Sequence, residues 1–490
     1  MNVNPGRSAF AALAGLLLVA ACEPERTTVG PPVAASRGDH GDGDGRVMTT
    51  FNPTGTLGTV SLTGGIDRGN PFFASLGTNG RSCATCHLQG DGFGISAASV
   101  QSIYYSTRGT DPLFAAVDGA NCPDVPARSA RGRSLLLNHG LIRVGVTPPA
   151  TAEFTVTAVR DPYGCAIQNG EVSVYRRPLP TTNLRFLSVV MWDGRETLQG
   201  LADRATVEAN LRADLVHQAQ SATLGHAQAS RAPTAAQLNS IVDFELGLFS
   251  AQWNDRAAGR LTALDARGGP LALARTEYYP GINDPLGGNP TGAAFDPSAF
   301  TLYQSWRTLG QSRDNRARAS VARGEVVFNT HPLSITGVTG LNDALSVATI
   351  PGTCTTCHDS PDVGNHSLPV PLDIGVSHVA GQESDGQVAA GMAMLSQPEM
   401  PVFRVTCTAG PRAGREYITS DPGRALVTGK CADVGRMKGP ILRALSSRAP
   451  FFHNGSAATL AQVVDFYNVR FQMGLSDQEK EDLQAFLRSL

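Results

Sequence analysis

Two segments of the chain place apolar residues at the spacing of an amphipathic helix. One opens with Thr234 and Gln237 and the other with Ser476 and Glu479, and each pair has the spacing of a capping box that begins a helix. The apolar positions that we expect to be buried are Leu238, Ile241, Phe244 and Leu248 in the first segment and Leu483, Phe486, Leu487 and Leu490 in the second. The similar pattern predicts a repeated helical module.

A third helix is predicted around residues 460 to 467. Leu460, Val463, Val464 and Tyr467 fall at i, i+3, i+4 and i+7, so Tyr467 shares the inward apolar face. Strand signals are few, whereas Gly and Pro are abundant, with 53 and 31 residues. We therefore expect a mainly α fold, with long irregular loops and little β structure.

Length and composition predict the domain organisation. A chain of 490 residues that is 41% apolar can form two or three domains. We expect an N-terminal domain over residues 51–253 and a C-terminal domain over 313–490. Residues 254–312 are dense in Gly, Pro, Asn and Asp and are predicted to be a connector.

The N-terminus has the pattern of an export signal. The apolar run from Ala9 to Ala21 precedes Cys22 and resembles a bacterial lipoprotein signal, which predicts a signal peptide over 1–21 and a lipid anchor at Cys22. An ordinary cleaved secretory signal is the alternative, and both place the protein in the periplasm. Residues 22–50 are predicted to be a flexible linker. The Gly- and Asp-rich stretch at 38–45 within it resembles a calcium loop, but we favour a linker there too.

Charge and motifs narrow the function classes. The net charge of -2 gives no electrostatic footprint for nucleic acid. No Ser-His-Asp constellation or phosphate-binding loop stands out in the sequence. The binding partners of the protein must therefore be inferred from the chemistry of its individual motifs.

The strongest chemical signal is a pentapeptide, Cys-x-x-Cys-His, that occurs twice, at Cys83, Cys86 and His87 and at Cys354, Cys357 and His358. In this motif the two thiols attach a haem covalently and the histidine binds its iron, so we predict two c-type haems. One motif lies in each expected domain, so both are expected to be cytochrome c-type haem domains. Paired cysteines also bind zinc, but each pair here carries its own following histidine.

The second expected domain opens with three arginines, Arg313, Arg316 and Arg318. They are predicted to begin a helix that faces solvent, with contacts to haem propionates or to a redox partner as the alternatives.

The remaining cysteines form an even set. Nine cysteines less Cys22 and less four haem thiols leave Cys122, Cys165, Cys407 and Cys431. Because each pair is closer in sequence than any cross-pairing, we predict disulfides joining the first two and the last two, which suits an oxidising compartment.

Three further segments resemble the bacterial di-haem cytochrome c peroxidases and the related di-haem enzymes that mature a tryptophan-derived quinone cofactor. They are the run from Asn70 to Cys83, the segment Met191–Arg195, and Gly439–Arg443 continuing through Ala449–Gly455 to Val463–Asn468. The resemblance covers roughly residues 70–95, 176–198 and 316–490. It implies that peroxide reacts at the N-terminal haem, that the C-terminal haem supplies electrons, and that Trp192 lies between them as a relay. A buried structural tryptophan is the alternative for Trp192.

The resemblance also bears on the ligands of the second haem. The peroxidases carry Met where this chain has Tyr467, whereas the quinone-forming relatives carry Tyr. A phenolate favours ferric iron, and a thioether raises the reduction potential. Tyr467 and Met473 are therefore both candidate ligands, and His453 is expected to support the pocket by hydrogen bonds.

At the first haem the chain departs from the family. The family's switchable distal His has no counterpart here, which predicts an open, high-spin ferric iron, with His139 as an alternative distal ligand. Gln218 resembles the family's catalytic Gln, and the expected Glu is replaced by a stretch containing His226, a candidate acid-base or else an exposed helix residue. The family's calcium-binding Asn is replaced by Arg177, so calcium has little support.

The resulting hypothesis is a di-haem cytochrome c peroxidase that reduces hydrogen peroxide with electrons from a small c-type cytochrome or another periplasmic donor. One alternative is peroxide-driven oxidation of a protein or organic substrate through high-valent di-haem iron. The other is a non-enzymatic di-haem electron carrier.

Overall fold

The computed structural model describes Met1 and residues 47–126, 128–198, 204–310, 312–379, 386–395 and 399–490. The expected signal peptide, Cys22 and the stretch 38–45 lie outside the described residues. Residues 48–50 of the predicted linker belong to the first strand. Across the described ranges, no helix combines the length and the apolar character that a bilayer crossing needs.

The secondary structure is mixed, with 32% helix and 16% strand. The helices are α1 (Ala97–Thr107), α2 (Ser134–His139), α3 (Arg204–Gly225), α4 (Ala235–Leu246), α5 (Pro270–Leu273), α6 (Arg313–Thr330), α7 (Asn342–Leu345), α8 (Gly386–Ala393), α9 (Ala425–Thr428), α10 (Leu460–Arg470) and α11 (Asp477–Arg488). The strands are β1 (Met48–Asn52), β2 (Gly55–Ser61), β3 (Ile142–Val146), β4 (Phe154–Arg160), β5 (Ile167–Gln168), β6 (Glu171–Arg176), β7 (Leu248–Asp255), β8 (Gly259–Arg260), β9 (Leu333–Thr336), β10 (Thr349–Gly352), β11 (Val402–Cys407) and β12 (Glu416–Thr419).

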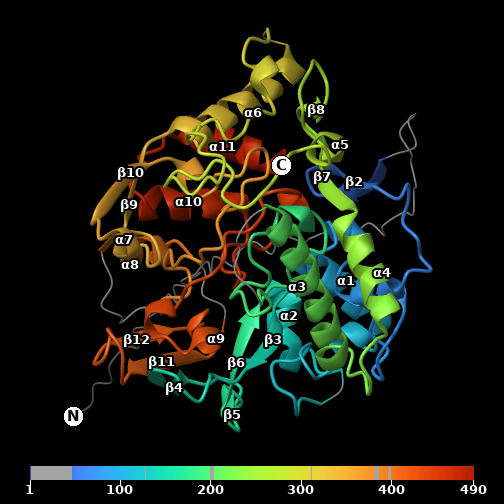
Figure 1. Cartoon of the computed structure of the whole chain (residues 1–490), viewed down its shortest axis with the longest axis vertical. Coiled ribbons are helices and arrows are strands. Elements are labelled where there is room, and N and C mark those ends of the chain that lie inside the picture. Colours follow the sequence, from blue (N-terminus) through green and yellow to red (C-terminus); the bar gives the residue numbers. More distant parts are fainter. Residues whose placement is uncertain (2–46, 127, 199–203, 311, 380–385, 396–398) are drawn as a thin grey trace. The chain divides into compact units, whose positions relative to one another are not determined.

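The expectation of a mainly α chain with little β structure is therefore only partly right. Within the described ranges, the strands form four small antiparallel sheets, ordered β1-β2-β7-β8, β9-β10, β12-β11-β4 and β3-β6-β5. Strand β4 pairs with β11, from the other half of the chain, with Val405 opposite Val156, and Figure 1 shows these strands side by side. Such short strands gain stability from distant partners, which local patterns do not reveal.

The predicted capping boxes are confirmed at both helices. Thr234 and Gln237 cap α4, and Ser476 and Glu479 cap α11. All eight expected apolar positions are buried. Leu248 and Leu490, however, lie beyond the helices: Leu248 begins β7 and Leu490 follows α11.

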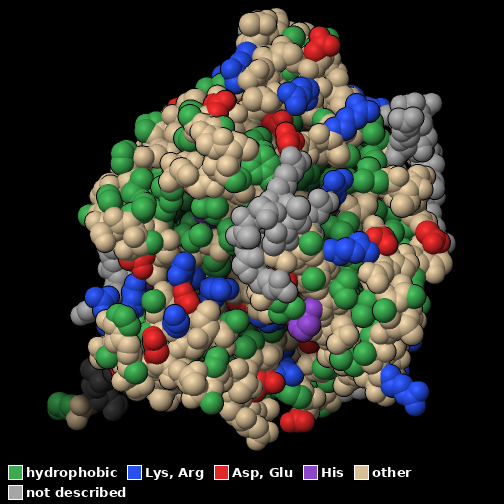
Figure 2. All heavy atoms as spheres, in the orientation of Figure 1, with side chains coloured by type: hydrophobic (Ala, Val, Ile, Leu, Met, Phe, Trp, Pro, Cys, Tyr) green, Lys and Arg blue, Asp and Glu red, His purple; other side chains and the backbone are tan. Residues whose placement is uncertain are grey.

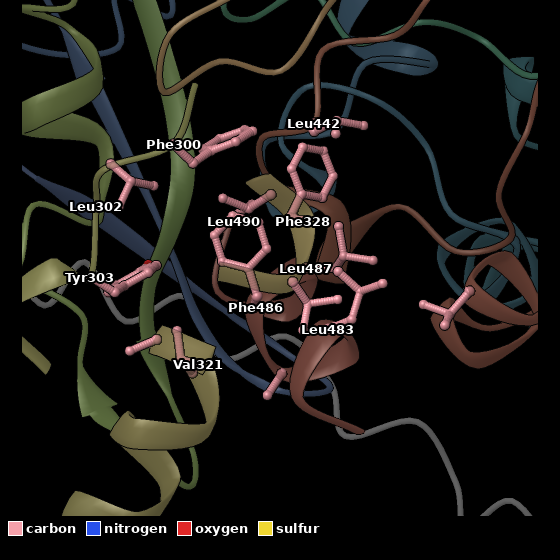
Figure 3. Packing of buried hydrophobic residues seen from close by; sticks show 14 of the residues in the cluster. Phe300, Leu302, Tyr303, Val321, Phe328, Leu442, Leu483, Phe486, Leu487 and Leu490 are labelled. Atoms are coloured by element: carbon pink, nitrogen blue, oxygen red, sulfur yellow. The ribbon is translucent and has the colours of Figure 1, made fainter. Parts of the chain in front are cut away.

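The largest hydrophobic core joins α6, α10 and α11 to the region predicted to be a connector. Phe300 from that region packs edge to face against Phe328 of α6 and Phe486 of α11, at ring-centre distances of 5.2 and 5.3 Å. Figure 3 shows these three rings converging. The region is thus part of the core, while the domain boundaries at 253 and 313 stay predictions.

Two further predictions concern covalent links and the surface. The disulfides Cys122–Cys165 and Cys407–Cys431 are both present, which confirms the predicted pairing. On the face shown in Figure 2, basic and acidic side chains are interspersed, in keeping with the small net charge.

Candidate functional site

The two Cys-x-x-Cys-His motifs adopt the same local structure. Each begins with a single 3₁₀ turn, Cys83–Thr85 in the first and Cys354–Thr356 in the second, opened by a capping box. In each, the histidine backbone N–H donates to the carbonyl of the first cysteine, at 3.1 and 3.0 Å. This turn brings the two thiols and the imidazole of a motif to one cavity.

The histidines are oriented alike. His87 Nδ1 donates to the carbonyl of Phe93 at 3.0 Å, and His358 Nδ1 donates to that of Gly364 at 2.6 Å, six residues downstream in both cases. Because a carbonyl only accepts, Nε2 is the nitrogen left without a proton in each neutral ring. Burial lowers the pKa of His87 to about 4 and also lowers that of His358, which keeps both rings neutral and able to bind a metal.

Among the described residues, the four motif cysteines form no disulfide. Burial raises the pKa of Cys83, Cys86, Cys354 and Cys357 to about 12. Two thiols and one following histidine in each cavity are the groups that a c-type haem uses for attachment and for iron binding. In the described residues no cluster of three or more His, Cys, Asp or Glu has the geometry of a metal site.

The first cavity contains the predicted catalytic residues near the first motif. Gln218 and His226 line it together with Cys83, Cys86 and His87. Gln218 lies on α3, and His226 follows directly after that helix, two turns beyond Gln218, so both reach the same cavity.

A carboxylate and an arginine orient His226. His226 Nδ1 contacts Asp118 Oδ2, and Arg81 forms an ion pair with the other oxygen of the same carboxylate. Burial opposes ionisation of Asp118, but the hydrogen bonds and charges of His226 and Arg81 outweigh it and lower the pKa of this carboxyl. Nε2 is then the ring nitrogen of His226 that remains for proton transfer in the cavity.

The second cavity holds both candidate iron ligands. Tyr467, on α10, and Met473 line it with Cys354, Cys357 and His358. Burial raises the pKa of Tyr467, and the neighbouring thiols of Cys357 and Cys354 add to the shift. The structure thus brings both candidates to the cavity without choosing between them.

His453 also lines the second cavity, where its Nε2 lies 3.1 Å from the Ser377 hydroxyl. Burial lowers its pKa to about 4, so the ring is neutral. This is the hydrogen-bonded position that the sequence led us to expect.

Trp192 lines the second cavity. The preceding residue, Met191, lines the first. The indole Nε1 donates to the carbonyl of Arg177 at 2.8 Å, and the ring centre is 6.1 Å from that of His453. The indole N–H is therefore satisfied, as a structural tryptophan also requires.

Other residues considered from the sequence lie elsewhere. His139 ends α2 and lines neither cavity. Arg313, Arg316 and Arg318 open α6 and also line neither cavity.

Over part of its length, the chain is similar to known cytochrome c peroxidases. No family model matches the sequence. The chain is 32% identical over 157 residues to the cytochrome c peroxidase IdrP2 of Denitromonas iodatirespirans, covering 30% of this chain and 38% of that protein. It is 34% identical over 99 residues to the cytochrome c551 peroxidase of Nitrosomonas europaea, covering 18% of this chain and 30% of the relative. The chain is a distant homologue of cytochrome c peroxidases.

The homology to these cytochrome c peroxidases is partial, since the matches span less than two fifths of each relative's length. Among solved structures, a MauG-like protein associated with microbial copper homeostasis aligns over 86% of this chain and 87% of its own, at 15% identity and a TM-score of 0.35. The roles of individual residues are therefore inferred from the contacts and cavities described above, and not from these similarities.

Sequence reasoning missed several residues that line the first cavity. Asp118 and Arg81 lie beside His226, while Glu245 and Lys438 are buried polar side chains far from any motif cysteine in sequence. Asp118 and Glu245 carry no local signal, because the residues around them in the cavity come from other parts of the chain. Arg81 lies within the Asn70–Cys83 segment, and Lys438 directly precedes the Gly439–Arg443 segment, so a local signal existed for these two residues.

Proposed function

We propose that the chain is a di-haem c-type cytochrome peroxidase, which reduces hydrogen peroxide in the first cavity with electrons relayed from the second. The observation that carries the proposal is the duplicated Cys-x-x-Cys-His turn, each copy opening onto an apolar cavity with an oriented, neutral histidine. Each haem, when bound, would supply an iron that changes oxidation state and reacts with or relays electrons to peroxide.

The protein residues would hold and orient these groups. Cys83 and Cys86 would attach one haem and Cys354 and Cys357 the other, with His87 and His358 as the iron ligands. Trp192 would connect the two cavities. Electrons would come from a small c-type cytochrome or another periplasmic donor.

Reduction of one hydrogen peroxide to two waters consumes two electrons and two protons, and the first cavity offers a proton carrier. His226, held by Asp118, can take a proton from one peroxide oxygen and return it to the other. Gln218 on the same side of the cavity can donate a hydrogen bond to peroxide.

The test is peroxide-dependent oxidation of a reduced small c-type cytochrome by the purified holoprotein, started from the fully ferric and the half-reduced forms. We expect turnover, and a loss of roughly 100-fold or more in the His226→Ala variant. His217→Ala is the matched control, because His217, on α3, also contacts a carboxylate, that of Glu196, but lines neither cavity. Peroxide turnover that is equal in both variants would remove His226 from the mechanism.

Tyr467 supports a second candidate function, oxidation of a protein or organic substrate, because a phenol in the second cavity can bind ferric iron. Resonance Raman bands of an iron phenolate, lost in Tyr467→Phe, would favour it. Absence of those bands, with no cytochrome oxidation and no spectral response to peroxide, would leave an electron carrier.

A further inference from the structure

The two cavities share a wall. Seven residues line both of them: Pro178, Leu179, Pro180, Lys438, Pro440, Ile441 and Arg448. We call these residues the shared wall. Five of the seven are proline, leucine or isoleucine. Lys438 and Arg448 are the only charged residues of the shared wall.

A third cation adjoins the shared wall. Arg177 lines the second cavity and donates from Nη2 to the carbonyl of Arg448 at 2.8 Å. Arg177 and Lys438 are buried, with 6% and 8% of their surface exposed, and Arg448 is half-buried.

These three cations bind only backbone carbonyls in the described part of the chain. Arg177 also donates to the carbonyls of Ile95 and His139, and Lys438 Nζ donates to that of Val189 at 3.2 Å. Arg448 donates to the carbonyls of Ile441, Arg443 and Ala444. None of the three forms an ion pair with a carboxylate among the described residues.

The acidic side chains that line the cavities form no ion pair with these three cations among the described residues. Asp373 binds His378 at 2.8 Å, and Asp118 binds Arg81 and His226. Glu245 has no ion pair with these cations, and its Oε2 has no hydrogen-bond partner among the described residues. Asp91 acts on Arg177 only from a distance, and its oxygens bind Ser96 and Ser99.

Unpaired positive charge at this depth is costly. Burial lowers the pKa of Lys438 to about 7, that of Arg448 to about 10 and that of Arg177 to about 9, and repulsion between the two arginines adds to the shift at Arg177. A negative group brought to the shared wall would relieve this cost, and carboxylates are among the anions that guanidinium groups bind through charge-assisted hydrogen bonds.

We propose that Arg177, Lys438 and Arg448 form an anion site at the shared wall that binds carboxylates from the groups held in both cavities. The inference rests on the proposed function, in which those carboxylates are the propionates of the two haems. Each haem, when bound, would then place carboxylates against side chains at the shared wall, so a change of charge at the wall would act on both haems.

The test is the midpoint potential of each haem, measured by spectroelectrochemical titration of the holoprotein. A positive charge near an iron disfavours its ferric state, so Arg448→Gln should lower the potentials of both haems, and Arg448→Lys should retain them near the wild-type values. Arg133→Gln is the matched control, because Arg133 is also a buried arginine that binds only carbonyls but lines neither cavity. If Arg448→Gln does not fold, Lys438→Met makes the same comparison.

Potentials that move no further in Arg448→Gln than in Arg133→Gln, with two haems attached per chain by mass spectrometry, would overturn the anion site and leave the proposed function standing. Wild-type potentials that change with added phosphate at constant ionic strength would also overturn it, since the cations would then bind a free anion. Absence of haem from the wild-type protein would instead contradict the proposed function itself.

Discussion

At the scale of single residues, the first cavity contains an unusual buried acid. Glu245, on α4, is 3% exposed, and its Oε2 lacks a hydrogen-bond partner in the described ranges. Burial raises its pKa to about 8, from an ordinary value of 4.5. The folded protein therefore holds a proton that the unfolded chain releases between these two pH values.

This proton makes stability depend on pH. Because the folded pKa lies above the unfolded one, the contribution of Glu245 is fully present below pH 4.5 and is lost as the pH rises toward 8, by on the order of 3 to 5 kcal/mol. We predict that Glu245→Gln reduces the fall in unfolding free energy between pH 5 and pH 8, measured by urea titration with circular dichroism. Glu481→Gln, at an exposed site, should not change the fall. An equal pH dependence in wild type and Glu245→Gln would contradict the assignment.

At the scale of elements, α6 and α11 cross at a glycine. A Cβ added to Gly324 on α6 would lie 2.0 Å from the carbonyl oxygen of Asp482 on α11. The Asp482 carboxylate also binds Arg323 and Ser320, at 2.7 and 2.6 Å, which holds the two backbones together. The absence of a side chain at Gly324 thus allows the backbones of α6 and α11 to pack closely at this point.

In an unconstrained helix, replacing Gly by Ala stabilises by up to about 1 kcal/mol. We predict that Gly324→Ala instead destabilises the protein by roughly 1 to 3 kcal/mol, because the helices must separate to admit the methyl group. Gly225→Ala, at the end of α3, has nothing within 4 Å of the added Cβ and should be neutral or mildly stabilising. Thermal unfolding of both variants checks the difference, and a stabilised Gly324→Ala would show that the crossing tolerates a side chain.

At the scale of the whole molecule, buried charges join segments from both halves of the chain. Arg176 on β6 binds the carboxylate of Asp421 through two nitrogens, at 2.7 and 2.9 Å, and also pairs with Asp193. All three side chains are almost fully buried. Burial raises the cost of ionising Asp193, but the charges of Arg176 and Arg195 outweigh it and lower its pKa to about 2.

Removing the arginine leaves buried carboxylates without their partner. We predict that Arg176→Met lowers the unfolding free energy by about 3 to 5 kcal/mol at pH 7. The loss should shrink as the pH falls toward 2, where the carboxyls take up protons in the variant. Arg212→Met removes an exposed pair with Asp243 and should cost at most about 1 kcal/mol. Equal losses of unfolding free energy in Arg176→Met and Arg212→Met, measured by urea unfolding, would contradict this prediction.

The sequence by itself determined the local features of this protein. The capping boxes at Thr234 and Ser476, the helix bearing Tyr467 and the turn of each Cys-x-x-Cys-His motif depend on residues within a few positions of one another, so their pattern is complete in the sequence. The disulfide pairing was also predictable, because each bond joins cysteines that are near in the chain.

Only the tertiary structure decided which distant residues meet. The pairing of β4 with β11, the contact of His226 with Asp118 and the gathering of Arg177, Lys438 and Arg448 at the shared wall join residues more than a hundred positions apart or from separate loops. Short strands and single polar side chains carry too little local signal to specify such partners, since burial and pairing arise only when the chain is folded.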